Sequence, residues 1–273
     1  MVFDKKIKPK KRLGQNFLAQ TGVIKKIVDA ADVKPGQTIL EIGPGTGNLT
    51  AQLAKTGNKV IAVEKDPLMA QVLKERFANV ANVEIITADI LFFDETKIAP
   101  PYKIVANLPF YAAAVIIRKF LEGTNPPLSM TVITQKEVGQ RICAKPPKMN
   151  LLAVATQFYA APRIIAMISR GCFWPQPKVD AAILQIIPLT RKGEHGDKKF
   201  SAEFFKIVKA GFSHPRKQLT NNLAKELNLD REIIQRWLEQ NNIKPTQRPE
   251  NLPVSDWIKL TQTQPMRYNN INR

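Results

Sequence analysis

Residues 37–50, QTILEIGPGTGNLT, decide the fold. The first half of this stretch is apolar and typical of a buried strand, and three alternating glycines lead directly into a helical pattern. A strand, a glycine-rich turn and a helix together open a nucleotide-binding α/β unit, because glycine lets backbone amides approach a ligand closely. The spacing is G-x-G-x-G with an acid two residues upstream, whereas dinucleotide-binding proteins carry G-x-G-x-x-G.

Three further predicted strands, over residues 60–63, 83–87 and 102–106, also lead into a polar residue. The carboxyl ends of parallel strands lie side by side along the ligand crevice of an open sheet. An acid after the second strand is suited to accept hydrogen bonds from two ribose hydroxyls. An acid after the third strand can accept from an adenine amino group, or it can simply cap a turn. We therefore expect one site built from four strand ends, at Gly43, Glu64, Asp89 and Asn107.

The fourth strand end continues as Asn107-Leu108-Pro109-Phe110. Asparagine offers a carbonyl acceptor, proline fixes its own φ and restricts the residue before it, and phenylalanine offers a flat face for a base. Taken alone, this stretch is more typical of an ordinary turn after a strand. Its place beside three other polar strand ends instead favours a binding site for a planar amino group.

The net charge of the chain indicates which class of molecule it binds. The 273 residues include 41 Lys and Arg against 23 Asp and Glu, a net charge of +18, and the pI is near 10.0. Residues 1–12 carry six basic groups and one acidic group, and residues 190–273 carry 16 and nine. Such an excess favours a polyanion, with nucleic acid ahead of an anionic membrane surface. We expect residues 1–12 to be a flexible basic arm that binds phosphates.

The pattern also predicts the domains. An α/β domain is expected over residues 13–189, a polar linker over 190–199 and a small all-helical domain for RNA or substrate over 200–273. There is no apolar run long enough to span a membrane and no secretory signal. Two cysteines and two histidines make neither a disulfide framework nor a zinc site, so we expect a reduced, cytoplasmic protein without metal. The pattern contains no heptad and no exposed apolar stripe, so we expect a monomer.

The assembled motifs closely resemble the ribosomal RNA small-subunit adenine dimethyltransferases, the KsgA or RsmA family, which is related to the antibiotic-resistance Erm enzymes. The resemblance covers nearly the whole chain in order. It rests on LGQNFL from residue 13, LEIGPGTG from 40, VEKD from 63, ADI from 88, NLPF from 107, QKEV from 135, PxPKVD from 175 and RKxL from 216. Phe110 stands where many bacterial relatives have tyrosine.

The resemblance implies a Rossmann-like, S-adenosylmethionine (SAM)-dependent methyltransferase sheet with helices on both faces. It implies that Asn16, Leu18, Gly43, Glu64, Asp89 and Asn107 bind SAM. It also implies dimethylation of two adjacent adenosines in a hairpin near the 3′ end of 16S rRNA, in the assembling 30S subunit. From the chemistry of the residues we assign catalysis to the stretch Asn107, Leu108, Pro109 and Phe110.

Three other functions compete with this one. A NAD-dependent dehydrogenase shares the glycine turn and the acid at residue 64, but it explains neither the loop spacing nor the charge. A non-catalytic nucleic-acid-binding protein on the same fold would not need four intact polar strand ends. An Erm-like 23S rRNA methyltransferase is the nearest rival, and the match over PxPKVD and RKxL favours the small-subunit enzyme.

Overall fold

The computed structural model describes residue 9 and residues 15–189 and 197–265. Contacts divide the chain into two compact units. The first unit comprises Met1–Gln140 and Ala160–Pro188, and the second comprises Arg141–Tyr159 and Leu189–Arg273. Residues 141–159 therefore group with the second unit, although the sequence-based division gives them to the α/β domain. The predicted arm, except residue 9, and most of the predicted linker lie outside the described residues.

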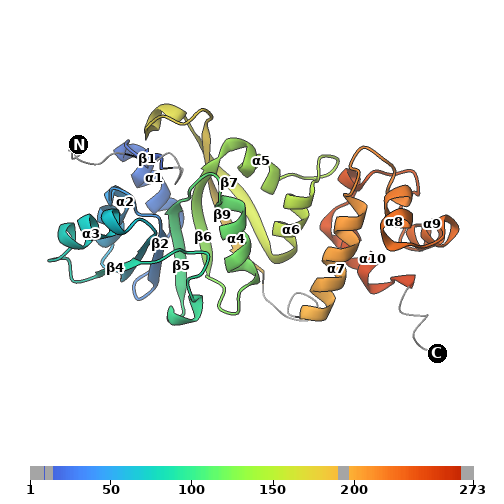
Figure 1. The fold of residues 1–273 in the computed structure, drawn as a ribbon, viewed down its shortest axis with the longest axis horizontal. Coiled ribbons are helices and arrows are strands. Elements are labelled where there is room, and N and C mark those ends of the chain that lie inside the picture. Colours follow the sequence, from blue (N-terminus) through green and yellow to red (C-terminus); the bar gives the residue numbers. More distant parts are fainter. Residues whose placement is uncertain (1–8, 10–14, 190–196, 266–273) are drawn as a thin grey trace. The chain divides into compact units, whose positions relative to one another are not determined.

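The described residues of the first unit form a seven-stranded sheet in the order β4-β3-β2-β5-β6-β9-β7 (Figure 1). The first five strands in this order run parallel to one another, and β9 pairs antiparallel with both of its neighbours, β6 and β7. The strands are β2 (Thr38–Ile42), β3 (Val60–Glu64), β4 (Val83–Thr87), β5 (Tyr102–Asn107), β6 (Ser129–Gln135), β7 (Ala160–Ile168) and β9 (Ala181–Pro188). The chain order reverses between β2 and β5, and such a switch point is where ligands bind in open α/β sheets.

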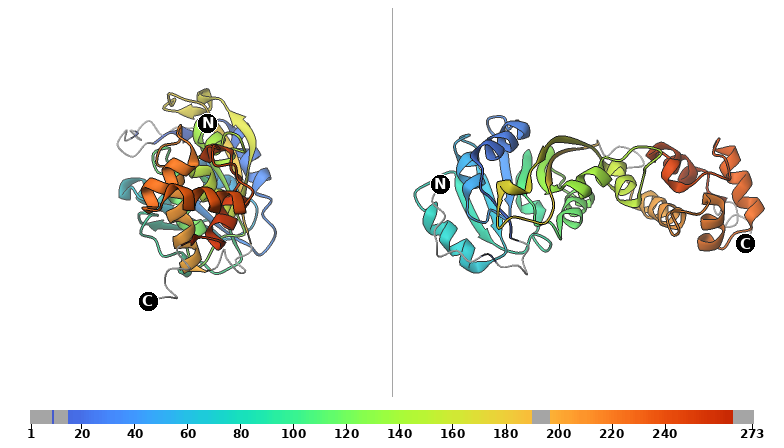
Figure 2. Two further views of the ribbon diagram at one scale, coloured as in Figure 1. Left: turned by 90° about the vertical axis from the view of Figure 1, so that its right-hand side faces the viewer. Right: turned by 90° about the horizontal axis from the view of Figure 1, so that it is seen from above.

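Helices cover both faces of this sheet, which confirms the predicted fold class. Helices α1 (Thr21–Ala31) and α2 (Asn48–Ala54) share a hydrophobic core with β2, β3, β5, β6 and β9. Helix α4 (Ala113–Glu122) buries its apolar face on the opposite side (Figure 2). The remaining elements are α3 (Pro67–Arg76), α5 (Lys136–Ile142) and 3-10 turns at Glu95–Lys97 and Arg170–Cys172.

A small two-stranded sheet lies in the same unit. Strand β1 (Phe17–Leu18) pairs antiparallel with β8 (Phe173–Trp174), so that Phe17 lies opposite Trp174. The backbone N–H of Ala19 also donates to the carbonyl of Cys172, at 2.9 Å. The segment that precedes the first helix is thereby fastened to a loop more than 150 residues away in sequence, a pairing that the sequence pattern does not predict.

The second unit is helical in its described residues. It contains α6 (Leu151–Tyr159), α7 (Lys198–Gly211), α8 (Leu219–Leu227), α9 (Arg231–Gln240), α10 (Val254–Gln262) and a 3-10 turn at Pro249–Asn251. The segment 151–159 is a helix. Its Phe158 is fully buried and stacks on Phe204 of α7, with ring centroids 4.0 Å apart. This aromatic contact explains why α6 belongs to the helical core rather than to the sheet.

The described residues lack two features that would mark other classes of protein. No helix there is long and apolar enough to cross a bilayer. No group of three or more metal-ligating side chains gathers in the same part of the chain.

Candidate active site

The four polar strand ends line one cavity of about 1090 Å³, including space open to solvent. Along the sheet they follow in the order Asp89, Glu64, Gly43 and Asn107, because β4, β3, β2 and β5 are neighbours. All residues assigned from sequence to the cofactor or to catalysis lie in the wall: Asn16, Leu18, Gly43, Glu64, Asp89, Asn107, Leu108, Pro109 and Phe110. The cavity also contains residues that sequence reasoning left unassigned, among them Glu41, Lys65, Asn48 and Tyr111.

The glycine turn brings bare backbone to the cavity wall. Gly43, Gly45 and Gly47 have φ angles of 65°, 56° and 76°, a left-handed conformation that side chains rarely adopt. A Cβ at Gly45 would lie 2.7 Å from the ring of Phe17, so the absence of a side chain also lets β1 pack over the turn. These glycines therefore serve both the close approach of a ligand and the seating of the N-terminal segment.

Glu64 is held rigidly at the end of β3. Its side chain is buried and accepts hydrogen bonds from the backbone N–H of Asp66 at 2.9 Å and of Gly45 at 3.2 Å. Burial raises the pKa of Glu64 above its ordinary value, and these backbone donors oppose the rise. A carboxylate accepts hydrogen bonds at both of its oxygens, which is what a pair of ribose hydroxyls requires.

A second acid, Glu41, lies in the same wall at the end of β2. It is 1% exposed, and its Oε2 has no hydrogen-bond partner among the described residues. Burial raises the pKa of Glu41 to about 8, and the nearby carboxyl group of Glu64 adds to the rise. The acid upstream of the glycine turn was visible in the sequence, but only the structure places it inside the cavity.

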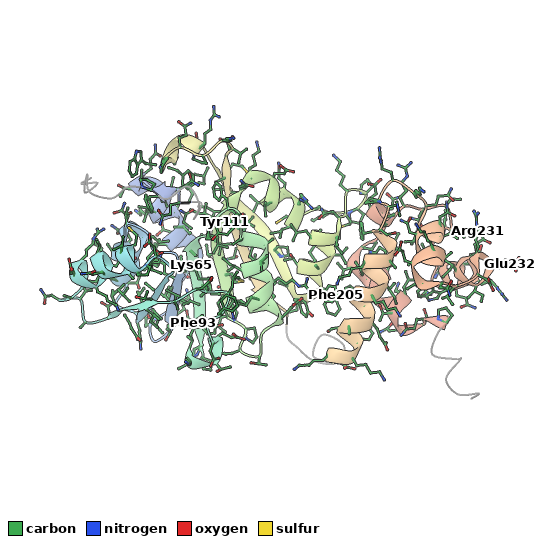
Figure 3. The ribbon with its side chains drawn as sticks, viewed as in Figure 1. Lys65, Phe93, Tyr111, Phe205, Arg231 and Glu232 are labelled. Carbon is green, nitrogen blue, oxygen red and sulfur yellow. The ribbon has the colours of Figure 1, made fainter. Side chains whose placement is uncertain are left out.

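Asp89 forms an ion pair at the cavity wall. Its Oδ2 lies 2.8 Å from Nζ of Lys65, and its Oδ1 accepts from the N–H of Leu91 at 3.0 Å. Burial acts to raise the pKa of Asp89, but the hydrogen bonds and the charge of Lys65 lower it on balance. The turn-capping and ligand-binding interpretations are thus compatible, since the carboxylate caps Leu91 and also lines the cavity. Figure 3 shows Lys65 and Tyr111, which both line this cavity.

Asn107 has the most informative geometry. Its Nδ2 donates to the backbone carbonyl of Asn16 at 2.8 Å. A carbonyl can only accept, so this contact fixes which end of the amide is the donor and leaves Oδ1 directed elsewhere. That oxygen is buried and has no partner among the described residues, which is uncommon for a polar atom in a folded protein. An unpartnered buried acceptor in a cavity wall indicates a ligand that donates hydrogen bonds.

The neighbours of Asn107 shape the same end of the cavity. Leu108 is 1% exposed, and its N–H donates to the carbonyl of Ile133 on β6 at 3.1 Å. The Phe110 and Phe173 rings pack edge to face, with centroids 6.1 Å apart and an angle of 72° between the planes. Because β8 holds Phe173, the Phe110 ring is supported by a distant part of the chain.

The N-terminal segment closes one side of the site. In addition to the contact between Asn107 and Asn16, the side-chain amide of Asn48 donates to the carbonyl of Leu18 at 3.4 Å. Residues 15–18, the described part of the LGQNFL segment, lie in the cavity wall, with Asn16 and Leu18 at positions that backbone contacts define.

This set of hydrogen-bonding groups suits a nucleoside with an attached amino-acid portion. It combines a buried acid for hydroxyls, an acid beside an apolar wall, bare glycine backbone and an unpartnered amide oxygen. The fold and this site together define a Rossmann-like methyltransferase. Solved structures agree at the level of fold: the 23S rRNA methyltransferase ErmE has a TM-score of 0.72 at 24% identity, covering 91% of this chain and 99% of that one. A dimethyladenosine transferase from Plasmodium falciparum has a TM-score of 0.74 at 24% identity, covering 93% and 97%.

Sequence relatives narrow the class to a family. The model of the ribosomal RNA adenine dimethylase family matches residues 6–264. A protein of Dehalococcoides mccartyi (strain CBDB1) named ribosomal RNA small subunit methyltransferase A is 42% identical over 258 residues, covering 93% of this chain and 88% of that protein. A Bacillus cytotoxicus protein of the same name is 38% identical over 265 residues, covering 92% and 90%. The chain belongs to the ribosomal RNA adenine dimethylase family, and it is an enzyme of that class.

Proposed function

We propose that this enzyme uses SAM to dimethylate the N6 amino groups of two adjacent adenosines in the 3′-terminal hairpin of 16S rRNA, within the assembling 30S subunit. The observation that carries the proposal is the buried, unpartnered Oδ1 of Asn107 in the cavity wall. Curated relatives named small-subunit methyltransferases support this substrate and do not favour an Erm-like 23S rRNA activity. Family membership likewise argues against a dehydrogenase or a non-catalytic binder.

The cavity fits SAM by the chemistry of its wall. Glu64 would accept from the ribose hydroxyls, Asp89 from the adenine amino group, and the backbone at Gly43 would face the methionine portion. Asn16, Leu18 and Asn107 would complete the SAM site from the N-terminal segment and β5. SAM supplies an electrophilic methyl group on a sulfonium. The task of the protein is then to align the nucleophile with that group and to keep water out.

The catalytic task falls on Asn107 and Leu108. The lone pair of an adenine amino group is delocalised into the ring, so the nitrogen is a weak nucleophile in its planar form. We infer that Asn107 Oδ1 and the Leu108 carbonyl accept the two N6 hydrogens and hold the nitrogen pyramidal. Pro109 restricts the backbone of Leu108, and this keeps the carbonyl in place.

Phe110 stacks on the base, which has to leave its helix or come from a single-stranded loop. Positive charge develops on N6 as the methyl group is transferred, and the two acceptor oxygens stabilise that charge. The amine loses a proton only after attack, so the reaction needs no general base of shifted pKa. A phenolic hydroxyl at position 110 is equally unnecessary, consistent with phenylalanine there.

Binding of RNA rests on charge outside the cavity. The net charge of +18 and the basic C-terminal residues are suited to a phosphate backbone. We propose that the second unit contacts rRNA, that the arm over residues 1–12 adds phosphate contacts, and that the enzyme acts as a cytoplasmic monomer on the 30S precursor.

The residue assignment is tested by Asn107→Ala. We expect methyl incorporation to fall by about 100-fold or more, on the scale of losing a preorganised transition-state contact. SAM affinity, measured separately by calorimetry, should change much less than turnover. Gln71→Ala is the control, because Gln71 is an exposed amide on α3 that bonds Glu75 away from the cavity. A near-normal rate for Asn107→Ala would refute the assignment.

The substrate is tested with ribosomal particles. Purified 30S precursors and 50S particles should be incubated with labelled SAM, and the modified nucleotides should be mapped. We expect N6,N6-dimethyladenosine at two adjacent positions of 16S rRNA in the 30S sample. Label appearing in 23S rRNA instead would overturn the small-subunit assignment while leaving the methyltransferase class intact.

A further inference from the structure

Two pairs of consecutive aromatic residues lie next to each other, one lining the cavity and the other packed against it, and each has one inner and one outer ring. In the first pair, Phe110 is half-buried whereas Tyr111 is 61% exposed. In the second pair, Phe173 is buried whereas Trp174 is 42% exposed. The inner rings contact each other edge to face, with centroids 6.1 Å apart. The two outer rings therefore flank a common inner pair.

The outer rings occupy defined positions rather than lying loosely on the surface. Trp174 belongs to β8, where its backbone pairs with Phe17, and its ring stacks on the Phe17 ring at 6.2 Å with 27° between the planes. Phe17 itself lines the cavity, so the Trp174 indole stacks on a ring that forms part of the cavity wall. Tyr111 lines the cavity directly, in the loop that precedes α4. Both outer rings are thus exposed in positions that the fold sets, where a bound partner can cover them.

Basic groups accompany the indole. Arg170 and Lys178 are exposed on either side of β8, and the Arg170 guanidinium donates to the carbonyl of Lys178 at 3.3 Å. Lys136, also exposed, follows β6, and its N–H donates to the carbonyl of Asp180 at 2.9 Å. Aromatic rings interleaved with cations are the arrangement by which proteins hold single-stranded nucleic acid, with bases on the rings and phosphates beside the charges. The net charge of +18 favours nucleic acid as the partner that this surface binds.

We propose that Trp174 and Tyr111 are stacking positions for the nucleotides next to the adenine being methylated. This inference rests on the proposed function, in which two adjacent adenosines are modified in turn. While one adenine occupies the cavity against Phe110, its neighbour remains outside with an unstacked face. An outer ring at the rim covers that face and holds the neighbour beside the entrance. The two outer rings thus select single-stranded RNA, whereas the cavity beside Phe110 selects adenine.

Tryptophan fluorescence offers a direct test on the whole protein. The chain has three tryptophans, and the other two, Trp237 and Trp257, are 2% and 0% exposed. Trp174 is therefore the one that acrylamide quenches readily. The probe is a hairpin oligonucleotide with the 3′-terminal 16S sequence, compared with the same hairpin lacking the base next to the target adenine. We expect the intact hairpin to quench the exposed emission and to protect it from acrylamide, and the abasic hairpin to do so much less.

Kinetics of matched variants complete the test. For Trp174→Leu and Tyr111→Leu, we expect the KM for RNA to rise about five- to tenfold, on the scale of losing one base stack. SAM affinity should stay unchanged. Trp174→Phe should restore most of the loss, because it keeps an aromatic face. The control is Phe92→Leu, which removes an aromatic ring that is 89% exposed but does not line the cavity.

Two results would overturn the stacking role. One is a Trp174 emission that does not respond to an RNA that the wild-type enzyme methylates. The other is a KM for Trp174→Leu that matches that of Phe92→Leu. Failure of the proposed function looks different: the wild-type enzyme would then leave the small-subunit RNA unmethylated, whatever the fluorescence shows.

Discussion

Glu41→Gln is expected to make the protein more stable at neutral and alkaline pH. The glutamine has the same shape, but it cannot ionise. In the native protein Glu41 is 1% exposed, and its Oε2 has no partner among the described residues, so its ionised form is poorly compensated. Burial raises its pKa from the ordinary value of 4.5 to about 8. The neutral form is therefore the one that the fold prefers at neutral pH.

The sign and size of the effect follow from linkage. The folded pKa lies above the unfolded pKa, so the stability associated with Glu41 is present in full below about pH 4.5 and is lost as pH rises through 8. One pKa unit corresponds to about 1.4 kcal/mol. Integrating between pH 5 and 8.5 gives a loss of roughly 4 kcal/mol, as an order of magnitude. Glu41→Gln should lack this loss and show a flatter pH profile.

The assay is urea unfolding of both proteins at several pH values across this range, with the circular dichroism of the protein as the signal. The control is Glu84→Gln, which removes an exposed acid paired with Lys59 at 2.9 Å and should change the profile little. The difference between Glu41→Gln and wild type should be small at pH 5 and should grow as pH rises. A difference independent of pH, or one that shrinks with rising pH, would refute the reasoning.

Three further changes test other parts of the structure. Gly45→Ala should weaken SAM binding at least tenfold by calorimetry, because φ is 56° and the new Cβ would meet the Phe17 ring; unchanged affinity would contradict the role of that turn. Gly211→Ala should cost about 1–3 kcal/mol of unfolding free energy in chemical denaturation, since its Cβ would clash with the buried Trp257 ring, and a wild-type midpoint would count against this packing. Deleting residues 1–12 should flatten the dependence of RNA affinity on salt, measured by filter binding, and an identical slope would exclude the arm as a phosphate contact.

Much of the fold could be predicted from the sequence because its signals are local. Buried parallel strands appear in the sequence as short apolar runs, and each of β2, β3, β4 and β5 has a residue of the site at or just after its carboxyl end. Parallel pairing then places those ends on one edge, so Gly43, Glu64, Asp89 and Asn107 could be grouped without coordinates. The resemblance to the family rests on the same local motifs, and family membership is confirmed.

Contacts between distant segments could not be predicted in this way. No periodicity in residues 17–18 or 173–174 announces that these two dipeptides pair, yet that pairing seats Phe17 over Gly45 and Phe173 against Phe110. The grouping of residues 141–159 with the helical unit is similar, since it depends on Phe158 stacking on Phe204.

The class of sheet, the set of polar strand ends and the excess of positive charge follow from the sequence alone, because composition and short-range pattern encode them. Which atoms of those residues remain available to a ligand depends on the tertiary structure. The Asn107 amide is oriented by a carbonyl 91 residues away, and Glu41 is neutralised by a cavity wall that several elements build together. Hydrogen-bond direction and burial depend on which residues lie close together in the fold, and a local sequence pattern does not predict contacts between distant segments.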